Sequence, residues 1–134
     1  SETTKQPSAD DIKKRAEDNF IEKDTRAKLA KGKKNAEAFI EASGLDVKIK
    51  SFETIEGTKK AIEESNLSKD DKKKALEDLD AGVFGGVEDG AGNIIIDETT
   101  AVEQGMVGVY THEVLHTVLN NKFKDDGAQS VAGK

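Results

Sequence analysis

Two histidines and one glutamate within five consecutive residues could form a metal site. The sequence HEVLH at residues 112–116 contains both histidines of the chain. On a helix, side chains four residues apart lie one turn above each other, so both imidazoles can bind one ion. Glu113 projects beside the pair, where a carboxylate can take a proton from zinc-bound water. The pattern predicts a zinc site with His112 and His116 as ligands and Glu113 as general base.

A long helix, over residues 100–121, is expected to carry this motif. Apolar residues fall on one arc of its helical wheel, which we expect to pack on the domain, and the histidines lie roughly opposite. This arc holds Met106, Val107, Tyr110, Val114 and Val118. Gly105 and Gly108 lie on the histidine side, where each costs about 1 kcal/mol relative to alanine, and this predicts a cleft over the metal. The alternative is an ordinary amphipathic helix with surface or core histidines, which does not explain Glu113 between them.

The length and composition of the chain limit its domain number, its zinc ligands and its partners. A chain of 134 residues fits one domain, and the absence of cysteine leaves histidines and carboxylates as zinc ligands. The net charge of -6 argues against a nucleic-acid partner, and no apolar stretch is long enough to predict a membrane span. We expect a soluble domain whose compartment the sequence does not reveal. Ser1 and Lys134 resemble cut points, so we expect a fragment of a longer chain.

The chain divides into a charged helical part, residues 8–80, and a glycine-rich part, residues 81–121, that has no lysine or arginine. In the first part we expect a helix over 9–30 that Gly32 interrupts, a second helix ending at Ser43 and Gly44, a strand over 45–52, and helices over 58–65 and 68–80. Ser8 and Ser68 are expected to cap helices. In the second part, residues 82–87 and 93–97 are expected to form a hairpin.

The β-branched strand at residues 93–97, followed by a helix with HEVLH, resembles the catalytic half of zincin metallopeptidases. The resemblance covers about the last third of the chain and implies an α+β zincin-like domain, with helices around a small sheet. It also implies that residues 93–97 form the edge strand beside the active-site helix, and that the backbone of a peptide or protein substrate pairs with this edge. The implied reaction is hydrolysis of a peptide bond, with zinc and Glu113 activating water.

Small zincin domains of this kind occur in bacterial toxin effectors and in phage or surface proteins. The resemblance is therefore compatible with this chain being a secreted or delivered effector domain that is attached to the remainder of a larger polypeptide. The alternative is a non-catalytic structural or binding module of a toxin or phage protein, which keeps the zincin shape after losing a ligand.

The sequence does not show a third zinc ligand at the positions that the familiar zincin patterns give it. The metzincin motif HExxHxxGxxH is excluded, because Leu119 and Lys122 stand at its last two signature positions. Asp125 and Asp126 are the acidic residues after His116, and they either bind the metal or belong to a polar helix exit. We expect the ligand beyond residue 134, on a helix beginning at Ser130.

Three further residues could act near the site. Tyr110 could stabilise an oxyanion, although its place on the apolar arc favours core packing. Asp97 and Glu103 could attract cationic groups of a substrate, but acids near a helix start are also expected from the helix dipole.

Overall fold

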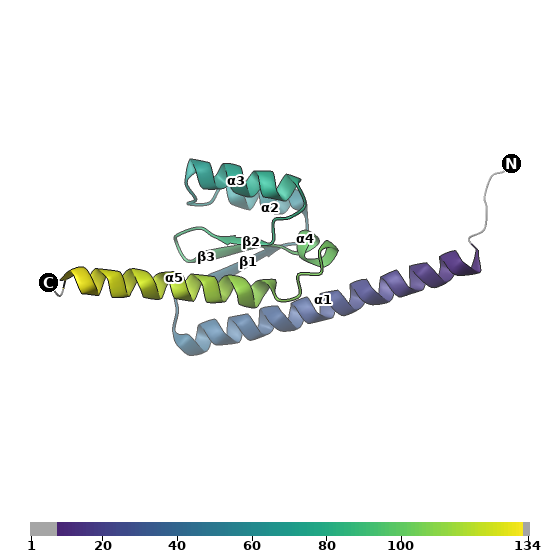
Figure 1. Cartoon of the computed structure of the whole chain (residues 1–134), viewed down its shortest axis with the longest axis horizontal. Helices are drawn as coiled ribbons and strands as arrows, with labels where there is room; N and C mark the ends of the chain where they lie inside the picture. Colours follow the sequence, from purple (N-terminus) through teal and green to yellow (C-terminus); the bar gives the residue numbers. More distant parts are fainter. Residues whose placement is uncertain (1–7, 133–134) are drawn as a thin grey trace.

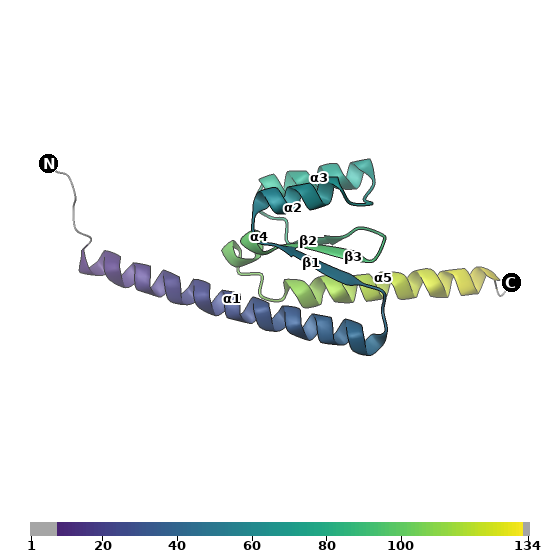
Figure 2. The ribbon, with the colours of Figure 1, turned by 180° about the vertical axis from the view of Figure 1, so that it is seen from behind.

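The fold is α+β, with a small mixed sheet between two helical layers (Figure 1). The computed structural model describes the backbone of residues 8–132 and the side chains of residues 8–120. Helices α2 and α3 cover one face of the sheet and helices α1 and α5 cover the other, and the view from behind shows the same layers (Figure 2). The fold class expected from the sequence is confirmed at this level.

Helix α1 (Ala9–Ser43) is a single helix of 35 residues. Its two ends agree with the sequence: Ser8 and Asp11 form a capping box, and Gly44 ends the helix in the left-handed conformation with φ 65°. The C-terminal half packs on α5, while the N-terminal end extends beyond the rest of the molecule (Figures 1 and 2).

The predicted interruption at Gly32 is wrong, since α1 runs through it. A glycine inside a helix costs about 1 kcal/mol, and burial of Leu29 and Ala36 on either side outweighs this cost. A β-carbon on Gly32 would lie 3.4 Å from the carbonyl oxygen of Val107. Helix α1 therefore passes close to the loop that precedes α5, at a distance that a β-carbon on Gly32 would fill as an ordinary van der Waals contact.

The sheet has the order β1-β3-β2. Strand β1 (Lys48–Phe52) pairs parallel with β3 (Asn93–Asp97), and β2 (Gly86–Glu88) pairs antiparallel with it. The hairpin of residues 82–87 with 93–97 is thus confirmed in its pairing, although β2 is shorter than expected. The assignment of 93–97 as the edge strand is wrong, because β3 is central. Among the described residues, β2 is the edge strand nearest to α5.

Two hydrophobic cores lie on the two faces of this sheet. Ile94 and Ile96 of β3 pack against α1 and α5, whereas Ile95 packs against α2 and α3. A strand buried on both faces needs a continuous apolar run, which explains the three successive isoleucines.

Helices α2 (Ile55–Glu63) and α3 (Lys69–Asp80) confirm the two short helices of the first part. Helix α2 begins earlier than expected because the Thr54 side chain accepts a hydrogen bond from the Gly57 N–H. Ser68 caps α3, as the sequence predicts.

The predicted helix over residues 100–121 is wrong, because two helices occupy this region. Helix α4 (Glu98–Glu103) ends before Gly105, which has φ 65°, and α5 (Val109–Ala132) begins four residues later. The Met106 N–H bonds to the Ala101 carbonyl, and the Gly105 N–H bonds to the Val102 carbonyl. This pair of bonds is a Schellman motif, which ends a helix at a left-handed glycine.

Candidate metal centre

The motif residues lie in the first two turns of α5, as the sequence predicts for a helix. The helix starts where the His112 N–H bonds to the Gly108 carbonyl at 2.9 Å. One face of α5 is anchored in the core by Val109, Tyr110, Val114 and Thr117, which are all buried. This anchoring fixes the direction in which the opposite face presents its side chains.

His112 and His116 lie together on the exposed side of α5. Their ring centroids are 5.0 Å apart and their planes are tilted by 53°. Two imidazoles at this spacing fit two positions of a tetrahedral zinc site. The structure therefore brings together the two predicted ligands, and neither histidine is part of the core.

Glu113 points to the side of the helix that faces the sheet. It is half-buried against β2, where a β-carbon added to Gly86 would lie 3.0 Å from Glu113 Cγ. Burial raises the pKa of the Glu113 carboxyl, and the nearby His112 and His116 partly offset this by favouring the charged form. A raised pKa is suited to a group that takes up and releases a proton.

A cleft of about 540 Å³ runs between β2, the segment before it and the start of α5. His112 and Glu113 line it together with Val83, Gly86, Met106 and Gly108. A cleft thus lies beside His112 and Glu113, but His116 and Gly105 do not line it, so a cleft over a metal held by both histidines stays a prediction. Gly108 lines the cleft from the loop before α5 rather than from inside a helix.

The edge of β2 offers unpaired backbone groups beside this cleft. The Asp97 N–H bonds to the Gly85 carbonyl at 3.2 Å, so Gly85 directs its carbonyl toward β3. Bonding alternates along an antiparallel pair, and the backbone groups of Gly86 and Glu88 therefore point away from β3. Within the described part of the chain, no other element bonds to these groups. They are available to an additional strand.

No third ligand joins the histidines among the residues whose side chains are described. The side chains of Asp125 and Asp126 lie outside that part of the chain. Helix α5 continues through both positions and through Ser130, so the expected start of a new helix at Ser130 is wrong. At a rise of about 1.5 Å per residue, the Asp125 backbone lies about 13 Å along the axis from His116.

Tyr110 belongs to the core, which favours the packing interpretation over a role in the cleft. It is fully buried, and its hydroxyl lies 2.7 Å from both Glu98 Oε2 and Ser51 Oγ. Burial raises the pKa of the Tyr110 hydroxyl, so it stays protonated and donates to Glu98. These bonds tie the first turn of α5 to β1 and α4.

Asp97 is likewise unavailable to a substrate. It is fully buried, and it accepts hydrogen bonds from the Thr58 hydroxyl at 2.6 Å and from the N–H and hydroxyl of Thr100. It caps α4 and joins that helix to α2. Glu103 is exposed at the end of α4 and does not line the cleft beside the histidines.

Sequence reasoning missed Gly86 as a part of the site. The run Gly85-Gly86 at the start of a short strand was a usable signal, because adjacent glycines often mark a close approach of two backbones or of a side chain to a backbone. The roles of Ser51 and Glu98 had no such signal, since their contact with Tyr110 depends on the tertiary fold.

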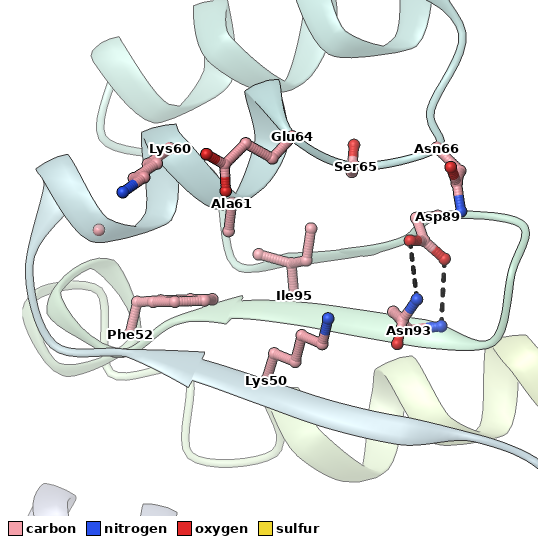
Figure 3. A pocket seen from close by; sticks show the side chains of 11 residues that line it. Lys50, Phe52, Lys60, Ala61, Glu64, Ser65, Asn66, Asp89, Asn93 and Ile95 are labelled. Atoms are coloured by element: carbon pink, nitrogen blue, oxygen red, sulfur yellow. Dashed lines mark hydrogen bonds between the residues drawn. The ribbon is translucent and has the colours of Figure 1, made fainter.

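A second cavity, of about 420 Å³, lies on the opposite face of the sheet beneath α2 (Figure 3). Phe52 and Ile95 form its apolar floor, and Lys50 reaches into it from β1. Asp89 at its end accepts hydrogen bonds from the N–H groups of Ala91 and Asn93 and from the Asn93 amide. The carboxylate therefore holds the β2–β3 turn.

No family model, curated protein or solved structure matches the chain. The helices of the described residues include none that is long and apolar enough to cross a membrane.

Proposed function

We propose that this chain is a zincin-like metallopeptidase domain, in which His112 and His116 bind zinc and Glu113 is the general base. The observation that carries this proposal is the position of Glu113. Its side chain lines one cleft together with His112 and Gly86, and a β-carbon added to Gly86 of β2 would lie 3.0 Å from Glu113 Cγ. A purely structural metal site has no need of a half-buried carboxylate beside an open strand edge.

The site residues divide the work of peptide hydrolysis. Zinc, when bound, supplies a Lewis acid that polarises the scissile carbonyl and makes water a better nucleophile near neutral pH. The Glu113 carboxylate takes a proton from the attacking water and then donates it to the leaving amine. Burial of Glu113 helps this second step, because it favours the protonated form between the two transfers.

The β2 edge supplies a way to hold the substrate. An extended peptide can bond to the outward N–H and C=O groups of Gly86 and Glu88, as an added strand. Gly86 has no side chain to separate such a peptide from Glu113. This corrects the expectation from the sequence, which gave this role to residues 93–97.

A non-catalytic binding module is the second candidate. One observation favours it: the described side chains offer two zinc ligands, whereas catalytic zinc sites have three protein ligands and a water. Such a module would bind zinc or an extended peptide at the same cleft without cleaving it.

One experiment that compares wild type, Glu113→Gln and Glu103→Gln distinguishes the two candidate functions. Zinc content is measured with cleavage of fluorescently labelled, unfolded casein. We expect Glu113→Gln to retain zinc and to lose at least about 100-fold in turnover, since general bases contribute factors of this order. Glu103→Gln is the matched control, because it removes an exposed acid outside the cleft.

Equal cleavage by wild type and Glu113→Gln would refute the assigned base. If wild type binds zinc and cleaves nothing, the non-catalytic candidate is the better one.

A further inference from the structure

The cavity beneath α2 has no part in the proposed zinc chemistry, because it lies on the other face of the sheet. Its volume of about 420 Å³ is within the range of small-molecule sites in proteins. Phe52 of β1 and Ile95 of β3 form an apolar floor, and α2 forms the roof (Figure 3). A β-carbon on Gly57 of α2 would lie 3.4 Å from Phe52 Cδ1. The phenylalanine ring therefore packs against the roof as well as forming the floor.

Two polar groups of the cavity already have hydrogen-bond partners within the fold. Asp89 is buried, and its carboxylate accepts from the N–H groups of Ala91 and Asn93 and from the Asn93 amide. The Ser65 hydroxyl donates to the Ile62 carbonyl at 2.6 Å. These groups hold the turns on which they lie, so they have little capacity left for a ligand.

The ammonium groups of Lys50 and Lys60 differ in this respect. Among the residues whose side chains are described, neither ammonium has a carboxylate within salt-bridge distance. Lys50 reaches over the floor from β1, and Lys60 comes from α2 (Figure 3). Glu64 follows Lys60 by four residues on α2, a spacing at which it offsets part of the Lys60 charge. Lys50 lies on the other wall, so its charge is the one most available to a ligand.

We propose that this cavity binds a small organic carboxylate with an apolar body, such as an arylalkanoic acid. The carboxylate would bind the Lys50 ammonium, and the apolar body would lie on Phe52 and Ile95. An apolar floor beside an ammonium group matches a ligand with one anionic end and one apolar end, because charge-assisted hydrogen bonds are strong next to a surface that excludes water. The inference does not depend on the histidine site.

An organic cation is the competing ligand, because Glu64 also lines the cavity. The hydrogen bonds of the β2–β3 turn occupy Asp89, so two ammonium groups compare with one carboxylate among the described lining residues that is outside such a network. This balance favours the anion. The two ligand classes also predict opposite effects of Glu64→Gln, which should strengthen the binding of an anion and weaken the binding of a cation.

Four probes separate the effect of charge from that of apolar contact. Hydrocinnamate is the anion, hydrocinnamamide is its neutral isostere, phenylpropylamine is the corresponding cation, and propionate keeps the charge without the ring. Each is titrated into the ¹⁵N-labelled, metal-free chain and followed by the amide signals of Gly57, Ala61 and Asn93, which line the cavity. Hydrocinnamate should shift these signals and bind at least about 10-fold more tightly than each of the other three probes.

Three variants test the residues at physiological ionic strength. Lys50→Gln should weaken hydrocinnamate binding by at least about 10-fold, because it removes the ammonium and keeps a polar side chain. Glu64→Gln should strengthen it by about 2-fold, since it removes a screened, exposed charge of the wrong sign. Lys48→Gln is the matched control: it removes the same charge from an exposed position of β1 that does not line this cavity, and it should change the affinity by less than about 3-fold. The unliganded spectra establish that each variant folds.

The inference is overturned if hydrocinnamate shifts none of the lining signals, or if the amide or the amine binds as tightly as the acid. Equal weakening by Lys48→Gln and Lys50→Gln, or weaker hydrocinnamate binding in Glu64→Gln, would also contradict it. Because the protein is free of metal in these titrations, failure here leaves the proposed zinc site untouched. Failure of zinc binding or peptide cleavage likewise leaves the carboxylate site standing.

Discussion

Gly86 lies so close to Glu113 that a β-carbon added to the glycine would be 3.0 Å from Glu113 Cγ. The same β-carbon would be 2.6 Å from Ile96 Cδ1 of the neighbouring strand. The edge strand therefore approaches the general base of the proposed site through a residue without a side chain. This close approach gives the site two properties: a half-buried carboxylate and a backbone edge within its reach.

The first prediction concerns this contact. Gly86→Ala should destabilise the fold by about 1–3 kcal/mol, the usual cost of overpacking, because Ile96 and Glu113 must both move. It should also lower any peptidase activity, since Glu113 is displaced. Urea denaturation gives the stability change. Gly108→Ala is the matched control for stability, because its β-carbon has open space. If Gly108→Ala lowered the free energy of unfolding as much as Gly86→Ala does, the steric argument would be contradicted.

A second prediction follows from the raised pKa of the Glu113 carboxyl. An unfolded glutamate has a pKa of about 4.3, so the unfolded chain releases this proton at a lower pH than the folded chain does. The stability contributed by the protonated group is complete below about pH 4 and is lost as pH rises through the folded pKa. Metal-free Glu113→Gln should therefore gain stability relative to wild type between about pH 4 and pH 7.5.

Asp89 should show the opposite dependence of stability on pH when the free energy of unfolding is compared in the same way. Burial alone would raise the pKa of its carboxyl, but the hydrogen bonds from Ala91 and Asn93 outweigh burial and lower it. The stability that the ionised Asp89 carboxylate contributes is present above about pH 4 and is lost as pH falls through the folded pKa. Asp89→Asn should therefore lose stability relative to wild type at neutral pH and approach it in acid. If the stability difference from wild type changed with pH in the same direction for both variants, the pKa directions assigned to Glu113 and Asp89 would be contradicted.

A third prediction tests Tyr110 as a core residue. Tyr110→Phe keeps the ring but leaves Glu98 and Ser51 without their shared partner. We expect a loss of about 1–2 kcal/mol in the free energy of unfolding, with zinc content unchanged. Ser51→Ala should show a coupled effect in a double-mutant cycle. An unchanged stability with a large loss of turnover would instead indicate that the hydroxyl acts on the substrate.

Local patterns in the sequence predicted those parts of the fold that depend on neighbouring residues. The caps at Ser8 and Ser68 are side-chain bonds to the first helical turn, and the position of His112 and His116 on one face follows from helical spacing. Such contacts need no tertiary information.

The errors occur where distant contacts decide the structure. The β3 strand is central because it pairs with β1, more than 40 residues earlier in the chain, and no local pattern encodes that pairing. At Gly32, packing outweighs a weak helix propensity. At Gly105, apolar spacing continues across a left-handed glycine, and the periodicity hid a helix end that the glycine itself indicated.

The last prediction concerns the third ligand. Asp125 and Asp126 follow His116 by 9 and 10 residues on the same helix, α5. At about 1.5 Å per residue this separates their backbones from His116 by about 13–15 Å, which exceeds the reach of an aspartate to a shared ion. While α5 remains helical there, neither aspartate can complete the site.

Asp125→Asn combined with Asp126→Asn should therefore leave zinc affinity within about 3-fold of wild type, because the two ligands at His112 and His116 remain. The matched control is the double variant His112→Ala, His116→Ala, which should lose stoichiometric zinc. Isothermal titration with zinc on the three proteins measures both effects. A large loss of affinity in the aspartate variant would mean that α5 bends or unwinds to bring a carboxylate to the ion. Retention of one zinc per chain in the histidine variant would place the metal elsewhere and remove the basis of the proposed function.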